Sequence, residues 1–506
     1  MSNRSGGRNA RKKKRQNAKP LRRWSSPVNN RYRPLADADV QKVHAAALTL
    51  LADVGMASPT TRVAEAAVGA GATFEGGRLK FPPSMVEKYL GLAARAFTVH
   101  GRDPRHDFEA KSGEINFCTG GAAVKIMDPG ARDFRPSVLN DLLCLARVCD
   151  QLDNIQWFAR PVVATDVADP YELDVNTIYA AAAGTQKHIA TSFSSGDHVK
   201  RSLDMLDLLA GGSFRKRPFC TVHATTVVSP MTFAPDSLDV AVAALEIGMP
   251  VHVQTGPQAG ATAPATLAGC LAQVCAEGLA SLTVMQILKP GHPVILGNWA
   301  FTSDLRTGAF AGGGAEAALL GAASGQMSNF YGIPGGMGAG MTDSKLPDNQ
   351  AGFEKGLSVA LAALSGGGFV FESAGMLASL LGCSLEAMVI DDEMLGMIRR
   401  IGRGIEVSDE ALALDLIAET VHGPGHFLGA EQTLKVMETE FDYPILADRQ
   451  SPDDWVQAGA TDIRERAAQK VRSILGQTWA STIDPITDQA IRAAYPIYLE
   501  PKVSAA

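Results

Sequence analysis

Between residues 155 and 400 the sequence alternates seven times between a short apolar run and a longer helical pattern. The strand-like runs are expected at Ile155–Val163, His188–Ser194, Phe219–Val228, Pro250–Thr255, Pro293–Phe301, from Ile333 onward and at Gly368–Glu372. Strands that alternate with helices in this way pair into a parallel sheet. We therefore predict an α/β fold in which the sheet closes into a (β/α)8 TIM barrel. A doubly wound open sheet is the alternative.

The eighth strand of such a barrel is hard to place. A helical pattern from Ser408 to Val421 interrupts the series, and only His426–Leu428 remains as a short candidate. Asp453–Ala494 is helical and charged, and we expect it to pack outside the barrel. The predicted organisation is a basic tail (residues 1–33), an N-terminal α+β extension (34–135) and a barrel domain with C-terminal helices (136–506).

Charge is distributed unevenly along the chain. Residues 1–33 carry twelve Lys and Arg and no acidic residue, whereas the whole chain has a formal net charge of -6. A segment so charged and so poor in apolar residues is expected to be disordered. We interpret it as a solvated tail; docking on an acidic partner, on nucleic acid or on the protein's own acidic surface is the alternative. The rest of the chain predicts no contact with nucleic acid.

Apolar runs and cysteines bear on where the protein resides. No apolar run approaches the roughly 20 residues that a membrane helix needs. The seven cysteines form no CxxC pair, so reduced thiols in a cytoplasm are expected. The ten histidines show no metal-ligand spacing. Cys220 and His223 are three apart in a strand-like run, where they point to opposite faces, so no metal site is predicted.

The stretch Phe330–Glu354, FYGIPGGMGAGMTDSKLPDNQAGFE, is dense in glycine where a barrel strand should pass into its loop. Its glycines remove side chains so that another group can approach the backbone; they include Gly335, Gly336, Gly338 and Gly340. The polar residues Thr342–Lys345 follow directly. Active residues of parallel barrels lie at the carboxyl ends of strands, so we expect a functional site here.

The same rule nominates polar residues at the ends of the other predicted strands. The set comprises Asp166, Ser194, Ser195, Ser229, Gln254, Asn298, Trp299, Thr342, Asp343 and Glu372. The two adjacent serines are expected to cap the next helix. Asp343 is either functional or paired with Lys345, and Glu372, which closes an apolar strand, is either paired structurally or functional.

Aromatic residues near these strand ends suit a small cationic substrate. A quaternary ammonium binds to aromatic faces by cation–π attraction of about 0.5 to 2 kcal/mol per ring and needs no hydrogen-bond acceptor. The candidates are Phe193, Trp299, Phe301, Tyr331 and Phe371. Packing in the core is the alternative for each of them.

Three blocks of sequence resemble the trimethylamine methyltransferase family. They are the stretch from Phe330, INFCTGGAAVKIMD near the N-terminal side, and GPGHFLGAEQTLKVMETEF with DDWVQAGATDIRERA near the C-terminal side. The resemblance covers about Pro34 to Leu475. It implies a (β/α)8 barrel that moves a methyl group from a methylamine to the cobalt(I) of a corrinoid (cobalamin) on a separate small protein, with no cofactor bound permanently.

The resemblance also concerns one position of the glycine-rich stretch. In the members that give the family its name, pyrrolysine lies in the strand before the (T/S)D(A/S)K segment, and its imine ring is thought to hold the methylamine. The corresponding residue here is Met341, or a residue within one position of it. Methionine has no electrophilic imine, so the resemblance points to the pyrrolysine-free branch, which acts on quaternary amines such as glycine betaine.

These considerations assign a role to each candidate residue. Asp343 and Glu372 would offset the substrate's positive charge, and Asn298, Gln254 or His223 would hydrogen-bond a carboxylate. Trp299, Tyr331 and Phe193 would contact the ammonium, and the four glycines would let the corrinoid approach. A barrel that binds a methylated amine without turnover, or cleaves it as a lyase, is the alternative. Outer helices rich in Ala and Gly make a homo-oligomer plausible.

Overall fold

The computed structural model describes residues 31–500. The prediction for the basic tail therefore lies outside the described residues, except for residues 31–33.

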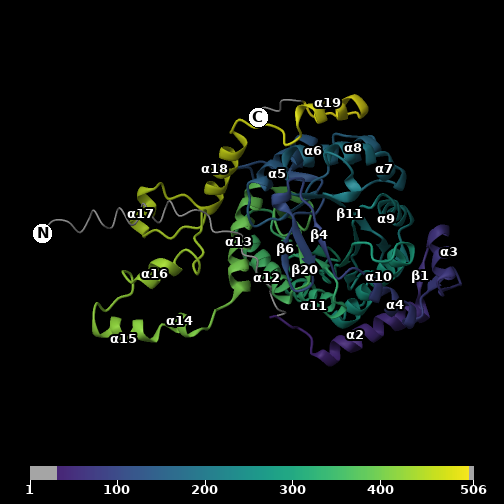
Figure 1. Cartoon of the computed structure of the whole chain (residues 1–506), viewed down its shortest axis with the longest axis horizontal. Coiled ribbons are helices and arrows are strands. Elements are labelled where there is room, and N and C mark those ends of the chain that lie inside the picture. Colours follow the sequence, from purple (N-terminus) through teal and green to yellow (C-terminus); the bar gives the residue numbers. More distant parts are fainter. Residues whose placement is uncertain (1–30, 501–506) are drawn as a thin grey trace.

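Eight parallel strands form the central sheet (Figure 1). In chain order they are β6 (Ile115–Phe117), β9 (Trp157–Ala159), β10 (His188–Thr191), β11 (Cys220–Thr225), β14 (Val251–Thr255), β16 (Val294–Asn298), β19 (Gly335–Gly338) and β20 (Gly368–Phe371). From β9 to β20 each strand pairs with the next in chain order, and β20 pairs with β6. A bridge between Cys118 and Trp157 joins the remaining edges. The predicted (β/α)8 barrel is confirmed, and the open sheet is excluded.

The predicted position of the eighth strand is wrong. His426–Leu428 forms no strand, and the strand that completes the barrel is β6, near the N-terminal side. The three-residue β6 is held from both sides: the Cys118 N–H donates to the Val370 carbonyl and the Gln156 N–H to the Phe117 carbonyl. The division at residues 135 and 136 stays a prediction about domains, but the barrel begins before it.

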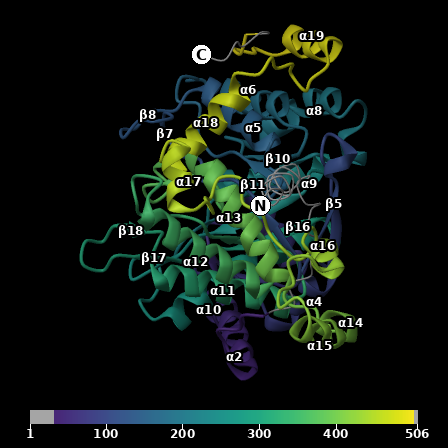
Figure 2. The ribbon, with the colours of Figure 1, turned by 90° about the vertical axis from the view of Figure 1, so that its left-hand side faces the viewer.

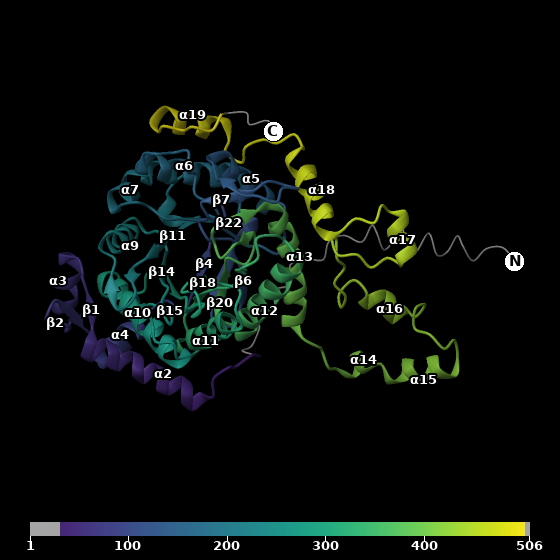
Figure 3. The same ribbon diagram turned by 180° about the vertical axis from the view of Figure 1, so that it is seen from behind.

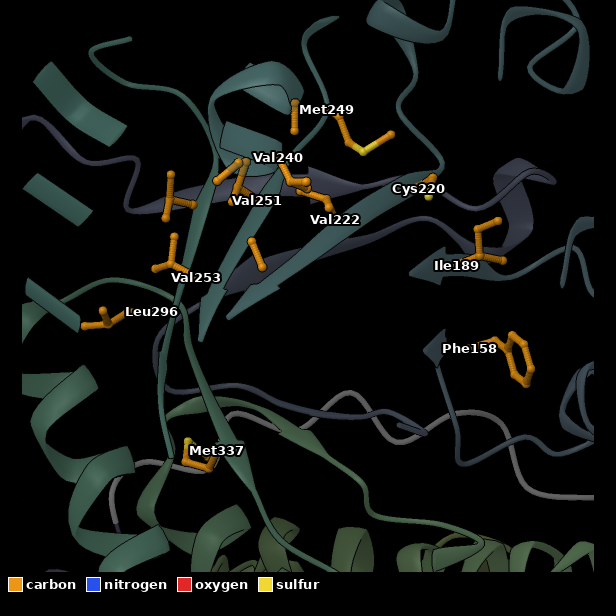
Figure 4. Packing of buried hydrophobic residues seen from close by; sticks show 14 of the residues in the cluster. Phe158, Ile189, Cys220, Val222, Val240, Met249, Val251, Val253, Leu296 and Met337 are labelled. Atoms are coloured by element: carbon orange, nitrogen blue, oxygen red, sulfur yellow. The ribbon is translucent and has the colours of Figure 1, made fainter. Parts of the chain in front are cut away.

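Helices surround the barrel in the expected order. They are α5 (Leu139–Asp150), α6 (Pro170–Gly184), α7 (Gly196–Arg201) with α8 (Leu203–Leu209), α9 (Pro235–Ile247), α10 (Leu267–Leu288), α11 (Ala315–Tyr331), α12 (Asn349–Ser365) and α13 (Leu385–Arg403). Several begin at a side chain that accepts a backbone N–H: Asp169, Ser195, Asp348 and Ser384. Strand residues that face outward, such as Phe158, Val222 and Leu296, pack against these helices (Figure 4).

Helix α10 corrects one expectation from the sequence. By length and composition it could cross a membrane, although no such run was predicted. It is largely buried and packs against α2 (Asp37–Thr49), α4 (Pro83–Leu92) and β16. This burial is that of a core helix. It is the one helix of this kind among residues 31–500.

The N-terminal segment covers one side of the barrel and fills its base. Besides α2 and α4 it contains a π-helical turn (Leu50–Val54), α3 (Thr61–Gly69), β1 (Met56–Ala57), β2 (Thr73–Glu75) and β3 (Arg78–Lys80). A hairpin of β4 (Ala96–Val99) and β5 (Phe108–Lys111) places Val99 and Ala110 against the interior rings Trp157 and Phe369. The hairpin therefore closes the amino-terminal end of the barrel, and the opposite end is left for a site.

Short strands in the loops build a rim at the carboxyl-terminal end. They are β7 (Lys125–Met127), β8 (Arg135–Pro136), β12 (Val227–Val228), β13 (Thr232–Phe233), β15 (Gln258–Ala259), β17 (Phe301–Ser303), β18 (Phe310–Ala311), β21 (Met376–Leu377) and β22 (Gly382–Ser384). They form three small sheets, one of them shared with β1 and β3.

An arm leaves the barrel after α13 (Figures 1 and 3). It carries α14 (Asp409–Leu412), α15 (Leu414–His422), α16 (Glu431–Val436) and α17 (Pro452–Gln457). The chain then returns through α18 (Ile463–Leu475), which packs on α13 and α5, and α19 (Pro485–Ala494), which packs on α8, as expected for the C-terminal helices. Figure 2 views the molecule from the side of the arm. Many apolar side chains of the arm are exposed, including Ile405, Leu414 and Val421.

Candidate active site

A cavity of about 240 Å³ lies at the carboxyl-terminal end of the barrel. Its wall is built from the ends of seven strands or the loops after them, so residues far apart in sequence meet there. The residues that line the cavity include Gly120, Arg160, Ser192, His223, Gln254, Trp299, Phe371 and Glu372. This is the position at which barrel enzymes keep their active sites.

One side of the cavity is aromatic. Phe371 stacks on His252 with ring centroids 4.4 Å apart, and Trp299 lies 6.0 Å from Phe371. His223 meets the edge of Phe371 at 5.0 Å. Trp157 lies 5.4 Å from Phe371 and forms part of the barrel interior. Rings from four strands and from the residue after a fifth strand thus support one another and leave little freedom for rotation.

The two histidines of this wall are uncharged at neutral pH. Burial, followed by the positive charge of Arg160, lowers the pKa of His223 to about 3. Burial also lowers the pKa of His252 well below its usual range. The Gln254 amide lies 3.3 Å from Nδ1 of His252 and 3.5 Å from Nδ1 of His223. The wall therefore presents neutral rings, whose faces attract cations.

Glu372 is the acidic group of the cavity. It follows β20 with a backbone φ of 61°, and its side chain is 2% exposed. Its Oε2 has no hydrogen-bond partner among residues 31–500. Burial raises the pKa of Glu372 to about 8, so the carboxyl group is largely protonated at neutral pH. A Cβ on Gly120 would lie 3.3 Å from Cγ of Glu372, so glycine leaves room for this side chain.

Arg160 is the basic group of the cavity, and sequence reasoning missed it. Its Nη2 donates to Oγ of Ser192 at 2.8 Å. Within residues 31–500 no carboxylate forms an ion pair with it, and burial lowers its pKa. The sequence prediction extended the strand to Val163, whereas β9 ends at Ala159, so Arg160 is the first residue after a barrel strand. A lone arginine in the apolar run WFARPVV was the available signal.

A second, more open cavity of about 620 Å³ lies at the rim. Thr225 lines both cavities. The lining of the outer cavity is mostly apolar and includes Phe301, Phe310, Leu380 and Leu381. The inner cavity is thus the smaller one, with aromatic rings in its wall, and the outer cavity beside it is wider and mostly apolar.

The four glycines of the glycine-rich stretch are surrounded by the chain itself. Cβ atoms on Gly335, Gly336, Gly338 and Gly340 would meet Ser328, His252 with Phe371, Trp299 with Phe301, and the Glu372–Ser373 backbone, respectively. The glycines thus allow the aromatic wall and α11 to pack closely. The corrinoid approach predicted for them stays a prediction, and these contacts give it no support.

Asp343 and Met341 lie in the loop above β19. Asp343 accepts hydrogen bonds from the backbone N–H groups of Gly312 and Gly313 and from the Ser379 hydroxyl. Met341 is 3% exposed, and a Cβ on Gly312 would lie 2.9 Å from the Met341 Cβ. Asp343 therefore holds the rim loops together. The expected effect of its charge on the substrate stays a prediction, because Asp343 does not line the inner cavity.

Three predicted substrate-binding residues lie away from the cavity. Asn298 points outward, because a Cβ on Gly278 of α10 would lie 2.1 Å from its Oδ1. Tyr331 ends α11 and meets the ring of His44 at 5.5 Å, outside the barrel. Phe193 is part of the core between strands and helices. For these three the predicted contact with substrate stays a prediction, and their positions give it no support.

Other strand-end candidates serve the structure. Oδ1 of Asp166 accepts the Leu139 N–H at the start of α5, and Ser195 caps α7, as expected. Ser194 binds Asp174, Ser229 donates to the buried Glu277, and Thr342 binds Glu354. Trp299, Gln254, His223 and Glu372 are the predicted site residues that the fold brings together.

Comparison with known proteins identifies relatives over nearly the whole chain. The sequence model of the family described as trimethylamine methyltransferase (MTTB) matches residues 4–496. A trimethylamine methyltransferase of Methanosarcina mazei is 30% identical over 454 residues, 88% of this chain and 91% of that protein. A glycine betaine methyltransferase of Desulfitobacterium hafniense is 30% identical over 471 residues, 92% of this chain and 96% of the relative. The solved monomethylamine methyltransferase of Methanosarcina barkeri aligns with 90% of this chain and 99% of its own, at 13% identity and a TM-score of 0.44.

Proposed function

This chain belongs to the trimethylamine methyltransferase family, and we propose that it transfers a methyl group from a quaternary amine such as glycine betaine to the cobalt(I) of a corrinoid. The observation that carries the proposal is the cavity in which neutral aromatic rings face the unpartnered Glu372. Such a chamber attracts a methylated ammonium, because the ring faces and the carboxyl group both favour a cation.

Met341 favours a quaternary substrate. Its buried thioether occupies the position, or lies within one residue of it, at which the resemblance expects an electrophilic imine. A tertiary amine needs activation before it can lose a methyl group. A quaternary amine already carries the positive charge that makes the departing amine a good leaving group, so the missing residue need not be replaced.

The reaction is a displacement at a methyl carbon. A corrinoid carried by a separate protein supplies, as cobalt(I), the electron pair that forms the new bond to carbon. The carbon–nitrogen bond breaks, its electron pair stays on nitrogen, and a neutral tertiary amine leaves. No proton is transferred to the leaving group, so the chain needs no general acid for this step.

The chain's contribution is therefore binding, orientation and exclusion of water. Trp299 and Phe371 hold the ammonium through their rings, and Glu372 ionises against it when the substrate enters. The aromatic wall keeps water from the methyl groups. The apolar outer cavity beside it fits the approach of a large flat group such as a corrinoid.

A barrel that only binds the amine, or cleaves it as a lyase, is the competing function. Methyl transfer is distinguished from binding alone or lyase cleavage by incubating the protein with glycine betaine, carnitine, choline or proline betaine, with and without cob(I)alamin. The proposal expects one amine to be demethylated only in the presence of cob(I)alamin, with an equal amount of methylated cobalamin. Thermal stabilisation by an amine without methyl transfer to any of the four would favour the competing function.

We propose a cytoplasmic location and a homo-oligomeric state for this protein. All seven cysteines are free and at least partly buried, which agrees with a reducing cytoplasm. The exposed apolar side chains of the arm favour a homo-oligomer, because isolated apolar surfaces of this extent are unusual on a monomer. Light scattering of the full chain would test this, and a monomer that stays monomeric at micromolar concentration would contradict it.

A further inference from the structure

The inner cavity holds one basic and one acidic side chain that do not pair with each other. Arg160 follows β9 and Glu372 follows β20, and β6 lies between these two strands in the barrel. No salt bridge joins the two side chains. The cavity therefore presents a cationic side chain after β9 and, two strands away, a side chain after β20 that can carry a negative charge, with aromatic rings in the same wall.

Unpaired charges in such a place are costly. Removing an arginine from water without an anionic partner destabilises the folded state, and burial disfavours the charged form of Arg160. The one hydrogen bond of its guanidinium group within residues 31–500 goes to the neutral hydroxyl of Ser192. Asp174, whose charge acts on Arg160 from a distance, is already bound by His198 and by Ser194. A ligand carboxylate would supply the anionic partner that Arg160 lacks within residues 31–500.

We propose that Arg160, supported by Ser192, binds the carboxylate of the methylated substrate and so selects short zwitterions over quaternary amines without an acid group. This inference rests on the proposed function, because it concerns the substrate of the same site. The ammonium of the zwitterion faces Glu372, Phe371 and Trp299, and the carboxylate reaches Arg160.

Arg160 fits this role better than the residues predicted from the sequence. Asn298 faces α10, outside the barrel. The Gln254 amide lies between the rings of His223 and His252, and both rings are neutral. A guanidinium presents a fixed fork of N–H groups that matches a carboxylate, and Ser192 occupies only one nitrogen of it.

The size of the chamber limits the zwitterion. A cavity of about 240 Å³ with fixed aromatic walls admits a compact molecule, in which few carbons separate the ammonium from the carboxylate. The separation of Arg160 and Glu372 in the wall then limits the spacing between the two charges of the ligand. A long-chain betaine would have to leave one charge unpaired.

Binding measurements test the inference without any corrinoid. Isothermal titration would compare glycine betaine with ethyltrimethylammonium, which replaces the carboxylate by a methyl group. We expect wild type to bind glycine betaine at least about 100-fold more tightly, because a buried charge pair is lost with the second ligand. R160M should reduce this ratio to below about tenfold, and S192A should reduce it by a few-fold. R62M, at an exposed arginine paired with Glu246 on the outside, is the matched control and should keep the wild-type ratio.

The outcomes separate the inference from the proposed function. A wild type that binds both ligands equally, or an R160M variant that keeps the wild-type ratio, overturns the role of Arg160 even if methyl transfer occurs. A preference for glycine betaine that depends on Arg160, without methyl transfer to cob(I)alamin, supports the inference and removes the proposed function. If R160M does not fold, R160K and S192A decide: unchanged ratios in both contradict the inference.

Discussion

His252 stacks on Phe371 inside the barrel, with ring centroids 4.4 Å apart and ring planes at 22°. The stack is possible because residue 336 is glycine. A Cβ there would lie 2.6 Å from Nε2 of His252 and 2.9 Å from Cε2 of Phe371. The glycine-rich strand β19 therefore shapes the aromatic wall that faces the cavity.

Replacing Gly336 by alanine should damage both stability and binding. The added methyl group must displace two buried rings, and overpacking of this kind costs about 1–3 kcal/mol. Urea unfolding would measure the loss, and titration with glycine betaine would measure the weaker binding. G352A is the control: nothing lies within 4 Å of a Cβ at this helical position, and alanine there should stabilise by up to about 1 kcal/mol. Equal stabilities of G336A and wild type would contradict the packing described above.

The charge of Glu372 should make binding of a cation depend on pH. Burial raises its pKa to about 8 in the free protein, and only the carboxylate form attracts the ammonium. Affinity for tetramethylammonium, which does not titrate, should therefore rise between about pH 6 and pH 9 and level off above that. E372Q should bind more weakly at pH 9 and show a flat profile. A rising profile that persists in E372Q would assign the dependence to another group.

The buried histidines should make the fold sensitive to acid. Burial lowers the pKa of both His188 and His223 to about 3, so between pH 6.5 and pH 3 the unfolded chain binds protons that the native chain does not. Stability is lost as pH falls through this range, by about 1.4 kcal/mol per pH unit for each histidine. Glu372 acts in the opposite direction between pH 4.5 and pH 8, since its native form holds the extra proton. The two histidines outweigh the one carboxyl group below pH 6.5.

The variant H223Q isolates this effect. Its free energy of unfolding should fall less steeply than that of wild type between pH 6 and pH 5, by up to about 1.4 kcal/mol over the unit. Urea titrations at both pH values measure the difference. Identical slopes in the two proteins would mean that His223 is protonated in the native state.

Asp343 should act on the rim loops, and its own charge should matter little to the chemistry. D343A removes the acceptor for the N–H groups of Gly312 and Gly313 and for the Ser379 hydroxyl. Faster amide hydrogen exchange is expected in the loops around residues 312 and 379, with a lower rate of methyl transfer and an unchanged pH profile. A changed pH profile with unaltered exchange would restore the role predicted from the sequence.

The sequence predicts the barrel well because seven of its strands are buried on both faces and read as apolar runs. β6 is only three residues long and is defined by the two strands that hold it, β20 and β9. No local pattern contains that information. Because β6 lacks a local pattern, the sequence favoured His426–Leu428, on the C-terminal side, as the eighth strand.

The sequence places the site at the ends of the barrel strands, but it does not place the individual residues that line the cavity. Asn298 and Trp299 were both nominated, but neighbours in a strand point to opposite faces, so one contacts α10 and the other lines the cavity. An error of a few residues at the end of β9 hid Arg160. Tyr331 and Phe193 belong to the buried hydrophobic core. The sequence alone does not distinguish an aromatic residue that packs in the core from one that binds a ligand.

Methyl transfer from glycine betaine to cob(I)alamin is the central claim, and its stoichiometry is the most direct test. The purified full chain would be mixed anaerobically with glycine betaine and cob(I)alamin, and methylated cobalamin and dimethylglycine would be quantified over time. We expect the two products to form in equal amounts, at a rate that depends on the protein and falls at least tenfold in W299A. Glycine betaine that binds to the protein while neither product forms would contradict the account.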